Sequence, residues 1–437
     1  MSHTSFERMY RGPAGRATLA LIGMRVAYAY NWLDIGPGLP AIGSSFGLST
    51  ADWGLLVAAF LLGAGLLQVP AGLMAARYGT RRISFIGAGL LTLGALASSL
   101  SPSFMVLLAL RFAAGAGAGL FFSPAIGLVA SLHPPGERGV PVGMFSSAFS
   151  AGAGLGVFAT AILLPALGWR SCLALGGLLM LALAAAALPI VPKTAGPPPP
   201  TRPKAPGTWR LPAALRSKAV WGVGLAFIGL EGASLSAGQY FVPYAHVVRG
   251  WDLAIAGAVG ALFVFPSVFG GPVGGRLAER SNHRRALMVL ATAVPALLLA
   301  ALPWVGPVEA ATIACVFSFA YGMVYAMMYI LPPYLPGLTS EDTPLAIGLL
   351  NALQLAGGAG VAYAVAWVAA SWGYAVAWPA LAAGVSLSLI FLIWVPPTGA
   401  SEGSRERPGG HGAPRRPEPG ESLAASLPPP TETYGQT

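Results

Sequence analysis

The sequence predicts an all-α membrane protein with twelve transmembrane helices arranged in two six-helix bundles. Of its 437 residues, 55% are hydrophobic and only 9% are charged, whereas about a quarter of the residues are charged in a soluble domain. Long apolar segments recur along the chain, each with the length that a helix needs to cross a bilayer. A basic loop occurs twice, about 203 positions apart, and such internal repetition is typical of secondary transporters.

The apolar segments predict where the chain crosses the membrane. In chain order the expected spans are 17–40, 53–74, 83–101, 104–130, 140–166, 170–191, 219–243, 253–276, 286–305, 308–335, 345–369 and 373–395. Gly and Ala are abundant in them, which favours helices that pack backbone to backbone, because lipid offers no hydrophobic drive for helix association. A transmembrane barrel would show short segments of alternating polarity, and the sequence shows none.

The spans divide six and six around a central segment that is rich in Pro and basic residues. The expected organisation is a cytoplasmic N-terminal tail (1–16), an N-terminal six-helix bundle (17–192), a cytoplasmic linker (193–218), a C-terminal six-helix bundle (219–397) and a disordered cytoplasmic tail (398–437). The composition of the linker predicts an extended segment. The tail lacks the large apolar residues that a folded core needs.

The distribution of basic residues predicts the orientation. Of the 25 Lys and Arg residues, 21 lie in tails and loops that share one side of the predicted topology, so the positive-inside rule places both termini in the cytoplasm. The net charge of +10 thus has a topological cause and does not indicate a nucleic-acid partner. We expect an integral protein of the plasma (cell inner) membrane, in contact with the lipid bilayer. Nothing in the sequence requires an oligomer, so a monomer is expected.

The sequence shows no pattern typical of an enzyme. Cys172 and Cys315 both lie inside apolar spans, and the five His residues are scattered without metal-ligand spacing. No nucleophile with a nearby base and no intact phosphate-binding glycine loop is visible. We therefore expect no catalysis, no metal and no cofactor.

Three motifs carry a family resemblance. Gly72, Arg77, Gly79, Arg81 and Arg82 match the pattern Gly-x-Leu-Ala-Asp-Arg-x-Gly-Arg-Arg between spans two and three. Span four contains Arg-x-x-x-Gly-x-Gly, and span six opens with Gly-Trp-Arg. The motif residues outside the first loop are Arg111, Gly115, Gly117, Gly119, Gly168, Trp169 and Arg170. Over about residues 17–395 the chain resembles the major facilitator superfamily.

This resemblance implies two six-helix bundles that rock about a central cavity lined mainly by spans one, four, seven and ten. It also implies that the basic loops act in gating, with an ion gradient or the substrate's own gradient as the driving force. The corresponding residues of the second loop are Glu279, Arg280, Arg284 and Arg285. The first loop departs from the pattern, because Ala76 occupies the position of the acid that Glu279 supplies in the second copy.

Four charged residues within the spans are candidates for function, because a charge at mid-bilayer costs about 2.5–3.5 kcal/mol on insertion scales. Glu231 lies near the middle of span seven and could load and release a proton. The alternative is a hydrogen-bonded packing residue. Arg25 either reaches back to the cytoplasmic interface or binds an anionic group in the cavity. Arg111 serves either proton coupling or packing.

The fourth charge, Asp34, stands near the outer end of span one. Tyr28, Asn31 and Asp34 follow at intervals of three and form one polar face of a helix. Alternatively, Asp34 caps the end of the helix at the outer rim, just before Gly36 and Pro37.

Neutral polar groups extend the candidate site. Tyr321, Tyr325 and Tyr329 recur at intervals of four, so they line one face of span ten, where rings and hydroxyls suit an organic substrate. Gln239, Asn351 and Gln354 add amides at membrane depth. Each of these groups could instead bond a neighbouring helix.

Three functions are compatible with these features. The first is secondary active transport of a small organic solute, leaning towards an organic anion, by alternating access with protons as the coupling ion. The second is proton-driven export of lipophilic cations, with Glu231 and Asp34 as cation receptors, although span five lacks the Gly-Pro pair of drug–proton antiporters. The third is a membrane sensor that keeps the fold and has lost transport.

Overall fold

The computed structural model describes residues 12–134, 137–193, 213–281, 283–332, 335, 338 and 343–395. Within these ranges the chain is almost entirely helical and contains no strand. Ten helical segments are long and apolar enough to cross a membrane, so the chain is an integral membrane protein. The expected tails (1–16 and 398–437) and the expected linker (193–218) lie mostly outside the described residues.

The first half of the chain contains the helices that lead up to the linker. They are α2 (Pro13–Leu33), η1 (Gly36–Gly38), α3 (Leu39–Phe46), α4 (Thr50–Tyr78), α5 (Thr80–Ser99), α6 (Phe104–Ser131) and α7 (Gly139–Ile190). At Gly168 the backbone of α7 leaves the helical region with φ 73° and ψ 163°, so α7 consists of two helices joined at a kink. Because α2 is not one of the ten membrane-length segments, the count of twelve spans stays a prediction.

The second half repeats this pattern. Its elements are α8 (Ala213–Arg216), α9 (Lys218–Pro243), η2 (Tyr244–Val248), α10 (Leu253–Leu262), α11 (Ser267–Arg280), α12 (Arg284–Leu299), η3 (Leu302–Trp304), α13 (Pro307–Ile330), α14 (Thr343–Trp372), α15 (Tyr374–Ser388) and η5 (Leu389–Trp394). Side-chain hydrogen bonds define where two of the helices begin. Ser49 and Asp52 form a capping box before α4, and the Asp252 carboxylate accepts the amide of Ala254 before α10.

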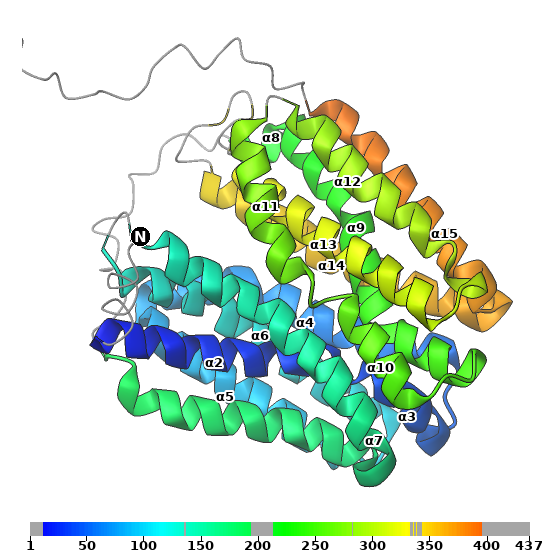
Figure 1. Cartoon of the computed structure of the whole chain (residues 1–437). Coiled ribbons are helices and arrows are strands. Elements are labelled where there is room, and N and C mark those ends of the chain that lie inside the picture. Colours follow the sequence, from blue (N-terminus) through cyan, green and yellow to red (C-terminus); the bar gives the residue numbers. More distant parts are fainter. Residues whose placement is uncertain are drawn as a thin grey trace, which may run out of the picture. The chain divides into compact units, whose positions relative to one another are not determined.

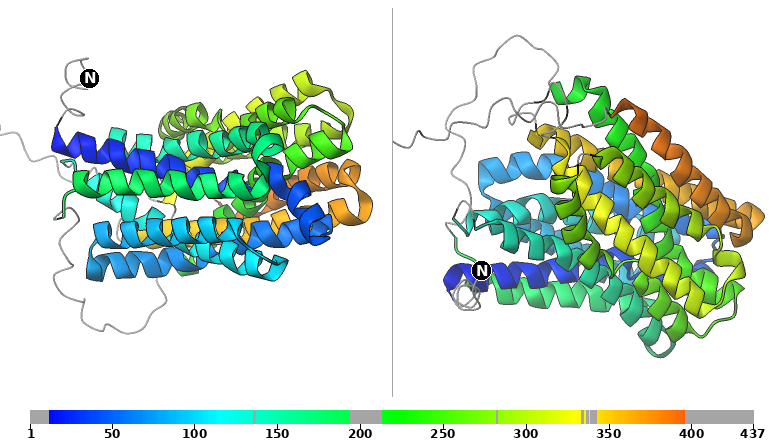
Figure 2. Two further views of the ribbon diagram at one scale, coloured as in Figure 1. Left: turned by 90° about the horizontal axis from the view of Figure 1, so that it is seen from below. Right: turned by 45° about the horizontal axis from the view of Figure 1, so that its top comes forward.

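The helices of each half pack mainly against one another (Figure 1). In the first half α2 lies along α7, as both views of Figure 2 show, while α6 packs between α4 and α5. In the second half α9 packs on α14 and α11 packs on α13. The halves meet where α4 contacts α14, where α7 contacts α10, and where η1 contacts α9.

Glycines allow the closest helix contacts. A Cβ atom on Gly115 would collide with the carbonyl oxygen of Phe60 on α4, and one on Gly117 would collide with the amide of Leu91 on α5. Gly152 of α7 faces the backbone of Val26 on α2 in the same way. The Gly-x-Gly pattern of α6 therefore brings two neighbouring backbones against one helix, as small residues do in membranes.

Replacing Gly115 with alanine is expected to lower the free energy of unfolding by about 1–3 kcal/mol, because the new methyl group has no space beside α4. The matched control is Gly89→Ala on α5, where a Cβ atom would meet nothing within 4 Å. The control should be neutral or slightly stabilising, since alanine favours a helix over glycine. Thermal unfolding in detergent measures both variants, and equal melting temperatures would contradict the argument.

The span expected at 253–276 is interrupted between α10 and α11. Residues Phe263 to Pro266 form turns, because the Pro266 ring carries no amide hydrogen and cannot continue the helical ladder. The Ser318 hydroxyl accepts the backbone amide of Ser267, at 3.0 Å. The Ser267 hydroxyl lies 2.6 Å from that of Ser150 on α7. The interruption therefore provides a polar contact between the two halves.

Candidate functional site

Arg25 lies among aromatic rings in the first half of the chain. Its guanidinium carbon is 4.3 Å from the ring centroids of Tyr28 and Phe122, and 4.9 Å and 5.5 Å from those of Phe149 and Phe145. The rings come from α2, α6 and α7, of which α2 and α7 approach closely at Gly152. Such cation–π contacts each contribute about 0.5–2 kcal/mol. We call these four rings the aromatic cage of Arg25.

The charge of Arg25 is buried without a balancing anion. The side chain is only 5% exposed, and its Nε and Nη1 atoms make no hydrogen bond within the described part of the chain. Among those residues, the only ion pair that the structure shows joins Arg111 to Asp34. The Arg25 side chain therefore does not extend to the cytoplasmic membrane interface. Its unused hydrogen-bond donors are available to an anionic group.

Glu231 is a buried acidic residue in the second half of the chain. It lies on α9, is 5% exposed, and accepts a hydrogen bond from the Tyr321 hydroxyl at 2.6 Å. The buried Gln354 side chain of α14 lies near the carboxyl group. No cation pairs with Glu231 among the described residues. A carboxyl group in this setting can exchange a proton without breaking an ion pair.

Three tyrosines of α13 connect this acid to the interface between the halves. We call Tyr321, Tyr325 and Tyr329 the tyrosine ladder; their successive ring centroids are 5.7 Å and 4.9 Å apart. The Tyr329 hydroxyl lies 3.2 Å from that of Tyr325 and donates to the Asn351 side-chain oxygen at 2.8 Å. The Asn351 amide in turn contacts the Gln68 side chain of α4. The ladder thus ends at a polar contact between the two halves.

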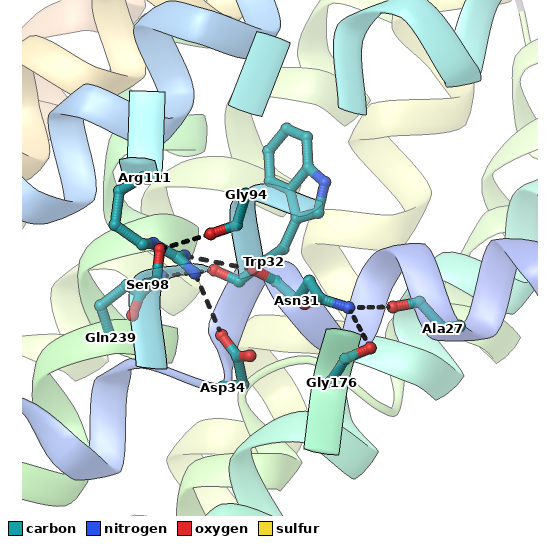
Figure 3. A network of polar contacts seen from close by, with 9 residues as sticks. All are labelled: Ala27, Asn31, Trp32, Asp34, Gly94, Ser98, Arg111, Gly176 and Gln239. Carbon is teal, nitrogen blue, oxygen red and sulfur yellow. Dashed lines mark hydrogen bonds and ion pairs between the residues drawn. The ribbon is translucent and has the colours of Figure 1, made fainter. Parts of the chain in front are cut away.

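Asp34 and Arg111 form a separate polar centre, shown in Figure 3. A guanidinium nitrogen of Arg111 lies 3.7 Å from the Asp34 carboxylate, and both side chains are at most 1% exposed. Arg111 also donates to the backbone oxygen of Asn31 at 3.2 Å. The ion pair joins α6 to the end of α2. Asp34 is therefore a buried partner of Arg111, rather than a carboxylate at an exposed rim.

The remaining candidates near this centre bond to backbone atoms. The Asn31 amide donates to the oxygens of Ala27 and Gly176, at 2.8 Å and 2.9 Å. The Gln239 amide of α9 donates to the backbone oxygen of Trp32 at 2.7 Å, across the interface between the halves (Figure 3). These amides connect helices in this conformation. Tyr28 lies apart from them, in the aromatic cage.

The two basic loops make equivalent contacts within their own halves. Arg81 donates to the backbone oxygens of Leu188 and Val191 at the end of α7. Arg285 donates to that of Val395, after the last helix. Cations at these positions satisfy carbonyl groups that a helix end leaves unpaired. Gly79 takes φ 92° in the tight turn between α4 and α5, a conformation that favours glycine.

The other residues expected in gating differ in their surroundings. Arg284 donates to the Ala278 backbone oxygen at 2.6 Å, while Arg77, Arg82 and Arg280 are exposed. Gly72 is also exposed and would have room for a side chain. The side chain of Glu279 lies outside the described residues. A gating role of the loops remains a proposal.

The structure brings the predicted site residues together in two groups. Around the interface lie Arg25, Tyr28, Glu231, Tyr321, Tyr325, Tyr329, Asn351 and Gln354. The second group contains Asn31, Asp34, Arg111 and Gln239. Sequence reasoning missed Phe122, Phe145 and Phe149 of the aromatic cage. The spacing of four between Phe145 and Phe149 was a signal, since it places both rings on one face of a helix.

Part of the sequence is similar to that of three known proteins. The 4-hydroxybenzoate transporter PcaK of Pseudomonas aeruginosa is 35% identical over 36% of this chain and 35% of its own length. The gallate transporter of Pseudomonas putida is 32% identical over 33% and 32%. The multidrug resistance protein Stp of Mycobacterium tuberculosis is 33% identical over 32% and 26%. The matched region thus covers only 26% to 35% of the length of these three relatives.

The fold similarity extends much further than these sequence matches. A bacterial homologue of the human lysosomal transporter Spinster superimposes with a TM-score of 0.70 at 18% identity, covering 88% of this chain and 95% of its own. The family model described as Major Facilitator Superfamily matches residues 19–359. By this match over most of its length, the chain belongs to the Major Facilitator Superfamily.

Proposed function

We propose that this protein is a secondary active transporter that moves a small aromatic carboxylate by alternating access, coupled to protons. One observation carries the proposal: the Arg25 guanidinium is buried among four rings with hydrogen-bond donors unused. A carboxylate would accept these donors in a bidentate charge-assisted pair. The aromatic ring attached to it would pack against the cage.

Energetics favour a ligand at this position. An unpaired cation in a low-dielectric interior costs several kcal/mol, which the cation–π contacts only partly offset. An anionic substrate would supply the missing counter-charge. The names of two relatives, a 4-hydroxybenzoate transporter and a gallate transporter, support an aromatic acid as that anion. Because Arg25 is nearly sealed from solvent here, substrate entry requires the helices around it to move apart.

Glu231 is the proposed site of the coupling proton. It accepts a hydrogen bond from Tyr321 and has no cation partner among the described residues. Glu231→Gln is therefore expected to abolish uphill accumulation driven by a proton gradient, because glutamine cannot carry the proton. Exchange of labelled for unlabelled substrate across proteoliposomes should continue within a few-fold of wild type. Retention of gradient-driven accumulation in this variant would refute the assignment.

A thermal-stability screen of the purified protein tests the substrate class, because a ligand of the folded state must stabilise it. The panel contains benzoate, 4-hydroxybenzoate, gallate, acetate and tetraphenylphosphonium. Stabilisation by the aromatic carboxylates above acetate, lost in Arg25→Met, is the expected result. Stabilisation by tetraphenylphosphonium alone would reject the proposal.

The similarity to Stp favours the second candidate, proton-driven export of lipophilic cations. In that mechanism Glu231 and Asp34 would both receive a cation. Asp34 is already paired with Arg111, which leaves only Glu231. A third candidate, a sensor without transport, would bind ligand in the screen but show no exchange in proteoliposomes.

A further inference from the structure

A buried hydrogen-bond donor without a partner lies next to the aromatic cage of Arg25. The Trp32 side chain is 4% exposed, and its indole nitrogen makes no hydrogen bond within the described part of the chain. The indole lies beside two rings of the cage, with its centroid 5.6 Å from that of Tyr28 and 5.4 Å from that of Phe149. A buried N–H group without an acceptor destabilises the folded protein, so its presence here requires an explanation.

Neighbouring rings hold the indole of Trp32 in one orientation. Phe60 of α4 and Phe149 of α7 meet it edge to face, at interplanar angles of 77° and 84°. The indole points away from Asp34 (Figure 3), and its nitrogen lies near the Tyr28 side chain without bonding it. The donor is therefore already ordered on the side of the cage, and a ligand that accepts from it need not pay to immobilise it.

Helix α2 sets the spacing between this donor and Arg25. Arg25, Tyr28 and Trp32 follow at intervals of three and four residues, so they share one face of the helix. The two outer residues of this set are about 10 Å apart along the helix axis. The Tyr28 ring lies between them, 4.3 Å from the guanidinium carbon and 5.6 Å from the indole. Because both groups belong to one helix, this spacing is kept when the surrounding helices move apart to admit a ligand.

We propose that Trp32 is a specificity-determining residue that selects aromatic carboxylates with a hydroxyl group opposite the carboxylate. This inference rests on the proposed function. The ligand carboxylate pairs with Arg25, the ligand ring packs on Tyr28, and the hydroxyl oxygen accepts the indole N–H of Trp32. An indole nitrogen can only donate, so a ligand with a methyl group in place of the hydroxyl leaves the buried donor unpaired.

The other groups of this site do not distinguish the two ligands. Arg25 binds the carboxylate that both of them carry, and the rings of the aromatic cage contact the apolar surface that both of them share. A site that hydrogen-bonds a substrate hydroxyl rejects the analogue without it far more strongly than an apolar pocket rejects a small change of size. The discrimination therefore depends on the single N–H group of Trp32.

The test measures the dissociation constants of 4-hydroxybenzoate and 4-methylbenzoate for the full-length protein in detergent at about pH 7, where both carboxyl groups are ionised. For wild type we expect the hydroxyl ligand to bind about tenfold tighter. In Trp32→Phe, which keeps an aromatic ring and removes the donor, the ratio should fall to about one, with the affinity for 4-methylbenzoate retained within a few-fold. A residue that acts only in packing would weaken both ligands together and leave the ratio unchanged.

The matched control is Trp53→Phe, which removes another buried indole nitrogen without a partner, beside Gly43 of α3; it should keep the wild-type ratio. If Trp32→Phe does not fold, 3-benzothienylalanine incorporated at position 32 decides the matter, because it keeps the shape of the indole and replaces the N–H with sulfur. A wild-type ratio in either form overturns the inference, as does wild type that binds both ligands equally. Failure of wild type to bind either carboxylate would instead reject the proposed function.

Discussion

Arg25→Met is expected to remove aromatic carboxylate binding and, in the same protein, to raise the stability of the ligand-free state. A hydrogen bond to a charged group contributes about 1.5–3 kcal/mol, so losing the pair should weaken binding about 10- to 100-fold or more. The stability gain follows because the buried guanidinium has no anionic partner among the described residues. A methionine of similar length fits among four rings without the cost of a desolvated charge.

Isothermal titration with 4-hydroxybenzoate and thermal unfolding of the ligand-free protein measure the two effects separately. Arg25→Lys is the matched control: it keeps the charge but loses the planar fork, and should bind with intermediate affinity. Opposite changes in affinity and stability distinguish a binding residue from a packing residue, whose removal would lower both. A methionine variant that binds the anion as wild type does would contradict the proposal.

Breaking the ion pair between Asp34 and Arg111 is expected to give the largest loss of stability. Both side chains are buried and lie 3.7 Å apart, so removing one charge strands the other in the protein interior. Asp34→Asn and Arg111→Met should each lower the free energy of unfolding by about 3–5 kcal/mol. The double variant should lose much less than the sum, because no unpaired charge remains.

Denaturation of the two single variants and the double variant forms a double-mutant cycle. A favourable coupling of at least about 1 kcal/mol is the expected result, since contacting residues are not additive. Additive losses would show that the two side chains act independently. The ligand affinity of each folded variant, measured with 4-hydroxybenzoate, provides the control: this centre is separate from Arg25, so affinity should change far less than in Arg25→Met.

Local sequence features were sufficient to predict the fold class. A segment that crosses lipid must satisfy its backbone hydrogen bonds internally, so its apolar length alone predicts a helix. The repeated basic loops around Arg81 and Arg285 indicated the duplication of the chain. This signal is also local, because each arginine bonds backbone oxygens within its own half. The break at Pro266 was not anticipated, although proline itself was the signal.

The charged residues inside the spans could also be identified from the sequence. The free-energy cost of a charged side chain at membrane depth comes from the bilayer, so it can be recognised without knowing the neighbouring helices. Arg25, Asp34, Arg111 and Glu231 were identified for this reason. Their partners were not. Asp34 joins an arginine on a helix far along the chain, and Glu231 joins Tyr321 of α13. Nothing in the spacing of these residues predicts either pair.

The sequence by itself thus determined the membrane class, the helical fold and the residues whose burial needs a reason. Only the tertiary structure decided that Arg111 has a counter-charge while Arg25 has aromatic rings instead. It also placed the Tyr321 hydroxyl on Glu231, at 2.6 Å. The physical reason is that helix formation is local, whereas the rotation of each helix depends on contacts with its neighbours, such as Gly115 on Phe60 and Gly152 on Val26.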